Sequence, residues 1–205
     1  MVRNCVITKA LVCIIVNPVG TITKLNGELL NNMPNWCSGR ATITGPAPVI
    51  AEIKTILEDP EGDLLNWMVP RPKSEDENWY QWNIENWGTK WSLTDVYIDN
   101  TVEEDSIEFS FSTAWAPPIN AFHTWAQNDG RVEFKLDYWE PGCAFVGTAW
   151  YDGDYLDDDY IDGNHDMDAY RLRASSEWGY EEWDEEPEPL TEWYKQGVED
   201  KGLEK

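Results

Sequence analysis

The chain has 205 residues, of which 41% are hydrophobic and 26% are charged, and 39 Asp and Glu residues against 15 Lys and Arg give it a formal net charge of -24. This length suits one compact domain with extensions, and the composition argues against an integral membrane protein. Such a negative surface disfavours direct binding to a phosphate backbone. Its charge is more compatible with binding to basic proteins, binding of cations, or a contribution to solubility.

The first 32 residues differ from the rest, because they contain three basic residues and a single acidic one. One interpretation is a signal peptide around the apolar run 10–16, but the run is short and no small-residue cleavage site follows it. The interpretation that we favour is a natural start at Met33, with 1–32 as a non-native leader or disordered head. A folded domain over 33–151 and an acidic, Trp- and Tyr-rich extension over 152–205 follow.

Hydrophobic periodicity predicts the elements of the folded domain. Alternating β-branched residues predict a strand over 40–44, and apolar residues at helical spacing predict a helix over 48–57. A long Trp-rich excursion over 62–93 comes next, within which 79–87 is compatible with a turn or two of helix. Its prolines argue against a central strand.

The second half of the domain alternates more regularly. The pattern predicts strands over 95–100 and 106–113, a helix over 119–127, and a hairpin of strands over 131–139 and 144–150. The complete order predicts an α+β fold: a ferredoxin-like antiparallel sheet with two helices on one face, an added edge strand, a long Trp-rich insertion and an acidic C-terminal extension.

Four motifs stand out along this domain. They are Met33-Pro34-Asn35-Trp36-Cys37, Asn86-Trp87-Gly88-Thr89-Lys90-Trp91, Phe111-Ser112-Thr113-Ala114-Trp115-Ala116-Pro117-Pro118, and Glu140-Pro141-Gly142. In this order they resemble the YubB-type ferredoxin-like domain family of small phage and conjugative-plasmid proteins, over roughly residues 33–151. The resemblance implies a mobile-element origin and supports Met33 as the start. It implies no iron–sulfur cluster and no particular activity.

The turn Trp87–Trp91 has two interpretations. It could present two aromatic faces and a Lys to a ligand, or it could be a Gly-permitted turn that seats two Trp side chains in the core. We favour a structural role for this turn and for the other motif residues. The complete set is Asn35, Trp36, Trp87, Gly88, Thr89, Lys90, Trp91, Trp115, Pro117, Pro118 and Gly142.

The acidic residues are concentrated late in the chain, where residues 151–205 contain 19 Asp and Glu against five Lys and Arg. The candidate acidic binding surface consists of Asp152, Asp154, Asp157, Asp158, Asp159, Asp162, Asp166 and Asp168. Neither register that starts at Asp152 or Asp162 satisfies a calcium-binding loop, so we predict no metal site. Side chains two apart on a strand lie about 6.6 Å apart, near the spacing of successive phosphates. The run could therefore imitate a phosphate track, or it could be a solvated acidic face.

Cysteines and histidines offer no catalytic arrangement. Cys5, Cys13, Cys37 and Cys143 lack the close spacing of iron–sulfur or zinc sites and favour buried thiols in a reducing cytoplasm. His123 and His165 are too far apart in sequence to argue a catalytic set. We predict no catalytic residue and no cofactor.

These observations favour a non-catalytic binding protein in the cytoplasm of a host cell. Its expected partner is a host protein with a basic surface, which the acidic surface would bind, in one version as a nucleic-acid mimic. Direct nucleic-acid binding and membrane association are not expected. The acidic–aromatic stretch 178–189 would fold on a partner or remain a flexible tail. The alternatives are a divalent-metal-dependent hydrolase or nucleotide-modifying enzyme that uses the Asp-rich run, and a structural virion component.

Overall fold

The computed structural model describes residues 35–99 and 104–180, so the predicted head, the start at Met33 and the last part of the acidic extension lie outside the described residues. The elements are β1 (Trp36–Thr44), α1 (Ala47–Glu58), α2 (Leu64–Met68), the 3-10 helix η1 (Lys73–Asn78), α3 (Trp79–Trp87), β2 (Thr94–Ile98), β3 (Ser106–Ala114), α4 (Ile119–Asp129), β4 (Glu133–Glu140), β5 (Phe145–Tyr151), β6 (Leu156–Asp162) and α5 (Met167–Trp178).

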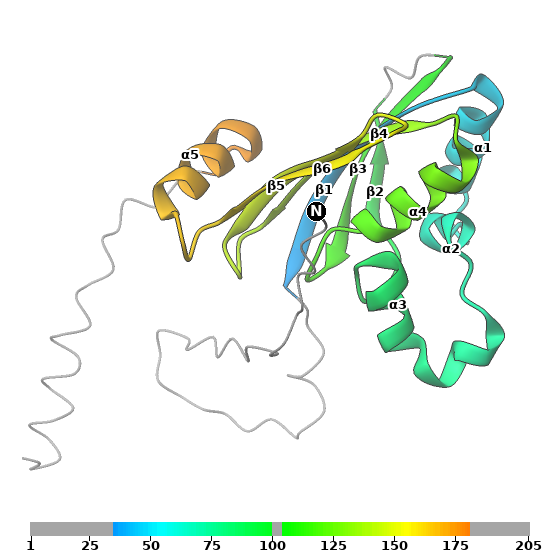
Figure 1. Ribbon diagram of the computed structural model, residues 1–205, viewed down its shortest axis with the longest axis horizontal. Coiled ribbons are helices and arrows are strands. Elements are labelled where there is room, and N and C mark those ends of the chain that lie inside the picture. Colours follow the sequence, from blue (N-terminus) through cyan, green and yellow to red (C-terminus); the bar gives the residue numbers. More distant parts are fainter. Residues whose placement is uncertain (1–34, 100–103, 181–205) are drawn as a thin grey trace, which may run out of the picture. The chain divides into compact units, whose positions relative to one another are not determined.

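The strands form one antiparallel sheet in the order β2-β3-β1-β4-β5-β6 (Figure 1). Its first four strands, with α1 between β1 and β2 and α4 between β3 and β4, have the ferredoxin-like β-α-β-β-α-β connectivity. The predicted α+β fold is thus confirmed. β5 extends the sheet as expected, but it is not the edge strand, because β6 pairs with its outer side. Neither β6 nor α5 was predicted.

The first strand begins four residues earlier than predicted, at Trp36. The sequence pattern did not predict this part of the strand, because Ser38 and Gly39 interrupt the alternation of β-branched residues. Gly39 has no side chain to clash with its cross-strand partner Phe111, whereas a Cβ at this position would lie 2.5 Å from the Phe111 ring. Glycine at this position therefore leaves space for an aromatic ring of β3.

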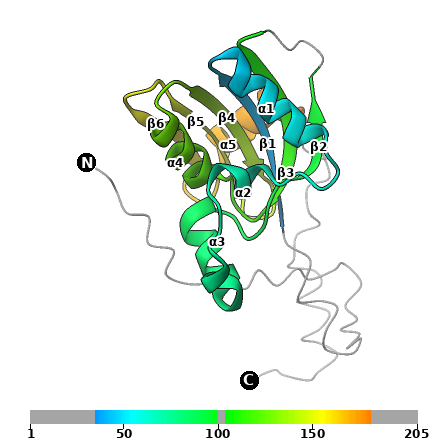
Figure 2. The same ribbon diagram turned by 90° about the vertical axis from the view of Figure 1, so that its right-hand side faces the viewer.

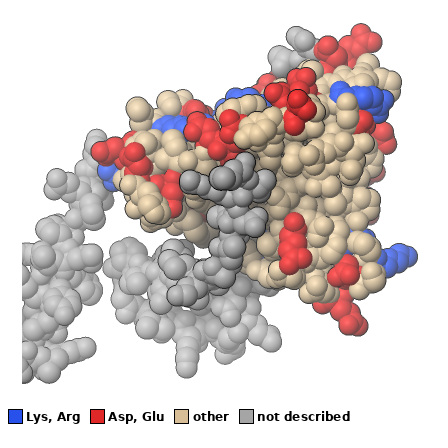
Figure 3. Space-filling model, viewed as in Figure 1, with Lys and Arg blue, Asp and Glu red and all other residues tan. Residues whose placement is uncertain are grey.

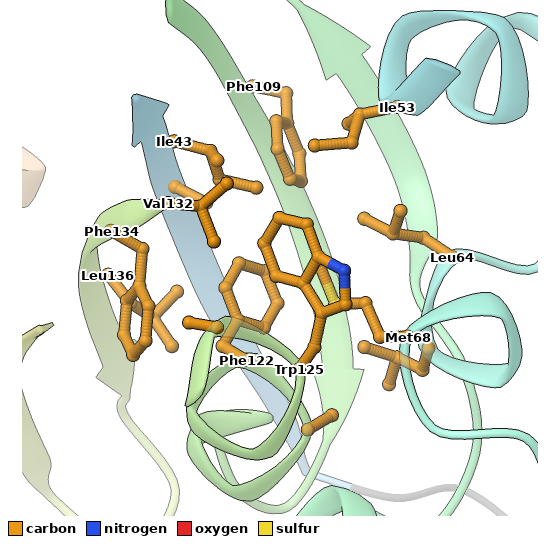
Figure 4. Close-up of a cluster of buried hydrophobic side chains, with 14 of the residues drawn as sticks. Ile43, Ile53, Leu64, Met68, Phe109, Phe122, Trp125, Val132, Phe134 and Leu136 are labelled. Carbon is orange, nitrogen blue, oxygen red and sulfur yellow. The ribbon is translucent and has the colours of Figure 1, made fainter. Parts of the chain in front are cut away.

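The main core lies between the sheet and the helices α1 and α4, which cover the same face of the sheet (Figure 2). Alternate residues of the strands point into it, among them the fully buried Ile43, Ile107 and Leu136. Helix α4 contributes Phe122 and Trp125, which lie between the strands and the side chains of α1 and α2 (Figure 4). The two expected helices thus pack on one face, as predicted.

The Trp-rich insertion folds into helices that cover the same side. The predicted helical segment 79–87 is α3, and α2 and η1 precede it. The ring of Trp67 packs 5.6 Å from that of Trp125, and the indole nitrogen of Trp87 donates a 2.9 Å hydrogen bond to the Val69 carbonyl. Aromatic contacts, together with the buried Leu64, Leu65 and Met68 of α2, therefore hold the insertion against the core.

On the opposite face of the sheet, α5 packs against β5 and β6 (Figures 1 and 2). A second, smaller core joins Tyr170 and Ala174 of this helix to Val146 of β5, with Trp139 and Trp178 packed around them. Residues 152–180 therefore continue the folded structure beyond β5. In the described ranges, no helix has both the length and the apolar character needed to cross a membrane.

Candidate binding surfaces

The predicted acidic residues lie along one edge of the sheet and the start of α5. Asp152 and Asp154 are in the β5–β6 turn, and Asp157, Asp158, Asp159 and Asp162 are in β6. Asp166 directly precedes α5, and Asp168 is in its first turn. We call this set the acidic side. Figure 3 shows red carboxylates over α5 and near the β5–β6 turn, and further acidic residues elsewhere on the same view.

Two of these carboxylates stabilise turns and helix ends. Asp152 accepts hydrogen bonds from the backbone amides of Tyr155 at 2.8 Å and Asp154 at 3.0 Å, and these bonds lower its pKa. Asp166 is the N-cap of α5 and accepts from the amide of Ala169 at 3.0 Å. Both residues therefore have local structural roles, while their charges remain exposed to solvent.

Asp162 organises the turn between β6 and α5. Its carboxylate accepts from the amide of Asn164 at 2.8 Å and lies 2.9 Å from Nδ1 of His165. Burial acts to raise the pKa of Asp162, but the hydrogen bonds from Asn164 and His165 outweigh it, so the pKa is lowered. The turn thus favours the ionised carboxylate.

Asp159 connects the edge strand to α5 through Arg173. The guanidinium lies 2.9 Å from the Asp159 carboxylate and also contacts Glu177 at 3.1 Å. It donates a 2.6 Å hydrogen bond to the hydroxyl of Thr148, which in turn donates to the carboxylate of Asp137 at 2.6 Å. This polar network lies beneath α5, so the charge of Asp159 is partly neutralised by Arg173.

Asp158 points to the other face of β6, because neighbouring residues of a strand alternate in direction. The hydroxyl of the buried Tyr138 donates a 2.6 Å hydrogen bond to it. Burial of the carboxylate raises the pKa of Asp158, the Tyr138 hydrogen bond opposes this rise, and the charges of Asp157 and Asp159 add to it. Only Asp157 and Asp159 of this strand therefore share a face at the spacing considered for a phosphate track.

The remaining acidic residues, Asp154, Asp157 and Asp168, have exposed side chains. Two tyrosines are interleaved with them: Tyr155 is 66% exposed and Tyr160 is 50% exposed. The acidic side thus combines exposed carboxylates with exposed aromatic rings, along the last strand in the order of the described sheet.

The motif residues of the Trp-rich turns converge at one end of the sheet, although four separate segments supply them. Gly88 has a φ of 87° and ends α3, and a Cβ there would lie 3.1 Å from the Pro117 carbonyl. The hydroxyl of the buried Thr89 donates a 2.9 Å hydrogen bond to the Ala114 carbonyl at the end of β3. With the buried Trp87, these residues fasten the turn 87–91 to the sheet and to the turn that precedes α4.

Above these anchors lies a group of aromatic side chains around one lysine, which we call the Lys90 patch. It consists of Trp36, Trp79, Tyr80, Lys90, Trp91 and Trp115. The ammonium nitrogen of Lys90 lies 4.4 Å from the ring centre of Trp91, 4.7 Å from that of Trp115 and 5.9 Å from that of Tyr80. These distances are typical of cation–π interactions.

Trp115 reaches this patch from a backbone conformation that is uncommon for a residue with a side chain. Its φ is 72°, and its amide donates a 2.9 Å hydrogen bond to the carbonyl of Asn35. Pro117 and Pro118 follow, and α4 begins directly after them at Ile119. The two motifs that contain Trp36 and Trp115 are therefore joined by their backbones.

The Glu140-Pro141-Gly142 turn lies at the same end of β1 and β4. Glu140 is fully buried, and its carboxylate accepts hydrogen bonds from the amides of Gly142 at 2.9 Å and of Cys143. A Cβ at Gly142 would lie 2.5 Å from the Asn35 side chain and 2.8 Å from the Glu140 carboxylate, so a larger residue would displace these side chains. Glu140 is part of a sequence motif, but no role was predicted for its carboxylate, which caps the turn that follows it.

The described cysteines and histidines do not form a catalytic group, although His165 lies beside Asp162 of the acidic side and Cys143 follows the Glu140 turn. Cys37 is buried and its pKa is raised by burial, whereas Cys143 is exposed. His123 packs 5.3 Å from the ring of Tyr151, and burial lowers its pKa. Over residues 35–99 and 104–180, no three His, Cys, Asp or Glu side chains are grouped so that they could hold a metal ion.

Comparison with solved structures finds similarity to the crystal structure of a protein Api92 from Yersinia pseudotuberculosis. The two share 11% sequence identity with a TM-score of 0.48, and the match covers 63% of this chain and 98% of that one. No curated protein matches the chain. A family model described as the ferredoxin-like domain in Api92-like protein matches residues 86–190, or 105 of 205 residues, which include the turns at Trp87–Trp91 and Trp115–Pro118. The chain therefore belongs to the family of Api92-like proteins that contain this ferredoxin-like domain.

Proposed function

We propose that this protein is a phage- or plasmid-encoded accessory protein that acts in the host cytoplasm by binding, not by catalysis, and that its acidic side contacts a basic surface of a host protein. The observation that carries the proposal is the negative charge of residues 152–180, which contain nine Asp and Glu residues but only two Arg residues. Such a local excess raises the rate of encounter with a basic partner and disfavours acidic ones.

The position of these charges supports side-chain recognition over strand pairing. β6 is an edge strand, and an edge strand invites another strand to pair with it. Consecutive carboxylates at Asp157, Asp158 and Asp159 discourage such pairing, because an added strand would partly remove water from these charges. Exposed Tyr155 and Tyr160 add aromatic contact area of the kind enriched at protein interfaces.

A nucleic-acid mimic is the specific form of this proposal. Exposed carboxylates at the turn, on β6 and on the first turn of α5 offer several negative charges to a groove that normally binds phosphates. The resemblance to phage and plasmid proteins makes a host nucleic-acid-binding protein the expected target. Neither the metal-dependent enzyme nor the virion component has a comparable observation in its favour.

The test compares the full chain with a variant in which Asp154→Asn, Asp157→Asn and Asp168→Asn are combined. These side chains are exposed and carry no turn or helix cap described above. Proteins captured from a bacterial lysate would be identified by mass spectrometry at several salt concentrations. We expect the wild-type chain to retain at least one basic nucleic-acid-binding protein, released by salt and by added duplex DNA, and the variant to retain much less of it.

The matched control combines Glu61→Gln, Glu77→Gln and Glu104→Gln, which change the net charge equally at exposed positions outside the acidic side. The control should capture the same partner as the wild-type chain. If both triple variants lost the same amount of captured partner, net charge alone, and not the acidic side, would explain the binding. Capture that neither DNA nor salt reverses would argue against the proposed mimicry.

A further inference from the structure

The Lys90 patch exposes more aromatic surface than a packed corner requires. Trp36 is 42% exposed, Trp79 37%, Tyr80 42% and Trp115 38%, and contacts between rings and with Lys90 connect these four side chains into one surface. Single exposed apolar residues are ordinary on protein surfaces, but contiguous groups mark interaction sites. Trp and Tyr are also the residues most enriched at the energetic centres of interfaces.

The patch is held in place from beneath. Trp87 and Thr89, on either side of Gly88, are buried. The Trp87 indole donates a hydrogen bond to the carbonyl of Val69, which follows α2, and the Thr89 hydroxyl donates one to the carbonyl of Ala114. The Asn83 side chain donates a 2.8 Å hydrogen bond to the carbonyl of Lys90 itself. A partner would therefore meet rings whose supporting backbone is already ordered, which lowers the entropic cost of binding.

Lys90 determines which charge the patch can accept. Its ammonium group already occupies the space between three rings, so a cationic ligand would meet a like charge there. Among the residues that the structure describes, no carboxylate lies within salt-bridge distance of Lys90. An anionic group would thus gain a charge-assisted hydrogen bond without displacing an existing ion pair.

The anion is better supplied by a peptide than by a nucleic acid strand. Stacking platforms for single-stranded nucleic acids combine aromatic rings with a positively charged groove that follows many phosphates. Here a single lysine lies among the rings of a chain with a net charge of -24. One carboxylate beside an apolar side chain satisfies the patch with much less repulsion.

We propose that the Lys90 patch binds an acidic peptide segment of a partner protein. A carboxylate of the segment contacts Lys90, and a neighbouring aromatic or proline side chain packs on the rings of Trp36, Tyr80 or Trp115. The site is separate from the acidic side and has the opposite charge preference.

The experiment is a selection from a random decapeptide library on the full chain, followed by affinity measurement of the enriched peptides. We expect enrichment of Asp or Glu next to Trp, Tyr, Phe or Pro. Lys90→Met retains a chain that can pack on the rings but removes the charge, and should weaken the enriched peptides at least tenfold. Lys90→Arg should preserve binding, and replacing the peptide's acids by their amides should abolish it.

Trp115→Gly provides a second variant, since glycine accepts the backbone conformation at this position and only the ring is lost. It should also weaken binding at least tenfold. The controls Tyr97→Ser and Tyr155→Ser remove more exposed aromatic rings outside the patch and should leave binding unchanged. The triple Asn variant of the acidic side should bind the peptides as the wild type does, so the two proposals can fail independently.

Three results would overturn the proposal. They are enriched peptides without a preference for acidic residues, equal enrichment on the wild-type and Lys90→Met chains, and binding of a deoxythymidine decamer that depends on the patch and exceeds that of the peptides.

Discussion

The hydroxyl of Tyr138 in β4 donates a 2.6 Å hydrogen bond to the carboxylate of Asp158 in β6, although β5 lies between these two strands. The contact is possible because Gly147 of β5 leaves space for the tyrosine ring that crosses it. One hydrogen bond thus connects the core of the sheet to its acidic edge.

Loss of this bond should destabilise the protein. Tyr138→Phe leaves the Asp158 carboxylate without this donor, and we expect about 0.5–1.5 kcal/mol less free energy of unfolding, measured by urea denaturation. In a double-mutant cycle with Asp158→Ala, the two changes should be less than additive by at least about 0.5 kcal/mol. Asp157→Asn is the control on the same strand, and full additivity in the cycle would contradict the coupling.

Gly147→Ala should be among the most damaging small substitutions in the sheet. A Cβ at this position would lie 2.2 Å from the Tyr138 hydroxyl oxygen and 2.4 Å from its ring, and the ring is buried and cannot swing away. We expect a loss of about 2–4 kcal/mol in unfolding experiments. Gly130→Ala offers a comparison: it has open space around the Cβ but a φ of 69°, and should cost only about 1 kcal/mol. Equal costs would show that the tyrosine moves aside.

The turn formed by Asp152 should contribute to stability in a pH-dependent way. Hydrogen bonds from the amides of Tyr155 and Asp154 lower its pKa in the folded state, so its contribution is complete above the unfolded pKa of about 3.9 and is lost as the pH falls through the lower folded value. The difference in urea midpoint between wild type and Asp152→Asn should therefore shrink below about pH 4. Carbon-13 NMR titration of the carboxyl group checks the cause directly, and a difference that stays constant with pH would refute it.

Two tryptophans of neighbouring motifs should respond differently to substitution. Trp87 is buried and hydrogen-bonded to Val69, so Trp87→Ala should cost about 3–5 kcal/mol. Trp115→Gly removes a partly exposed ring and relieves an unfavourable φ, so the change should stay within about 1 kcal/mol. Thermal denaturation of the two variants measures these losses of stability and so distinguishes a core tryptophan from a surface one. A large loss of stability for Trp115→Gly would show that Trp115 belongs to the core.

The described β6 and α5 illustrate what local pattern alone misses. Asp has a low strand propensity, so the sequence around Asp157–Asp159 does not predict a strand. It becomes one because β5 offers a pairing partner, while Tyr138 and Arg173, both distant in sequence, satisfy Asp158 and Asp159. Helix α5 has a mostly polar sequence and packs through Tyr170 and Ala174 on Val146. Tertiary contacts therefore overrode the low strand propensity of β6, and they gave α5 a packing surface that its sequence pattern does not reveal.

The motif turns illustrate the opposite case. Gly88, Pro117 and Pro118 mark a helix end and a helix start from their backbone chemistry alone, and the structure has α3 ending at Trp87 and α4 beginning at Ile119. Which side chains these turns expose does not follow from the same residues. Trp87 is buried and Trp91 lies against Lys90, although the two tryptophans are only four residues apart.

The sequence by itself determined the ferredoxin-like order of the first strands and helices, the helix-ending turns and the excess of acid late in the chain, because periodicity, glycine and proline geometry and charge are local properties. Only the tertiary structure decided that Trp36, Tyr80, Trp91 and Trp115 meet around Lys90 and that several acidic residues serve as caps or ion-pair partners. These contacts join residues far apart in the chain, and packing of the strands and helices brings them together.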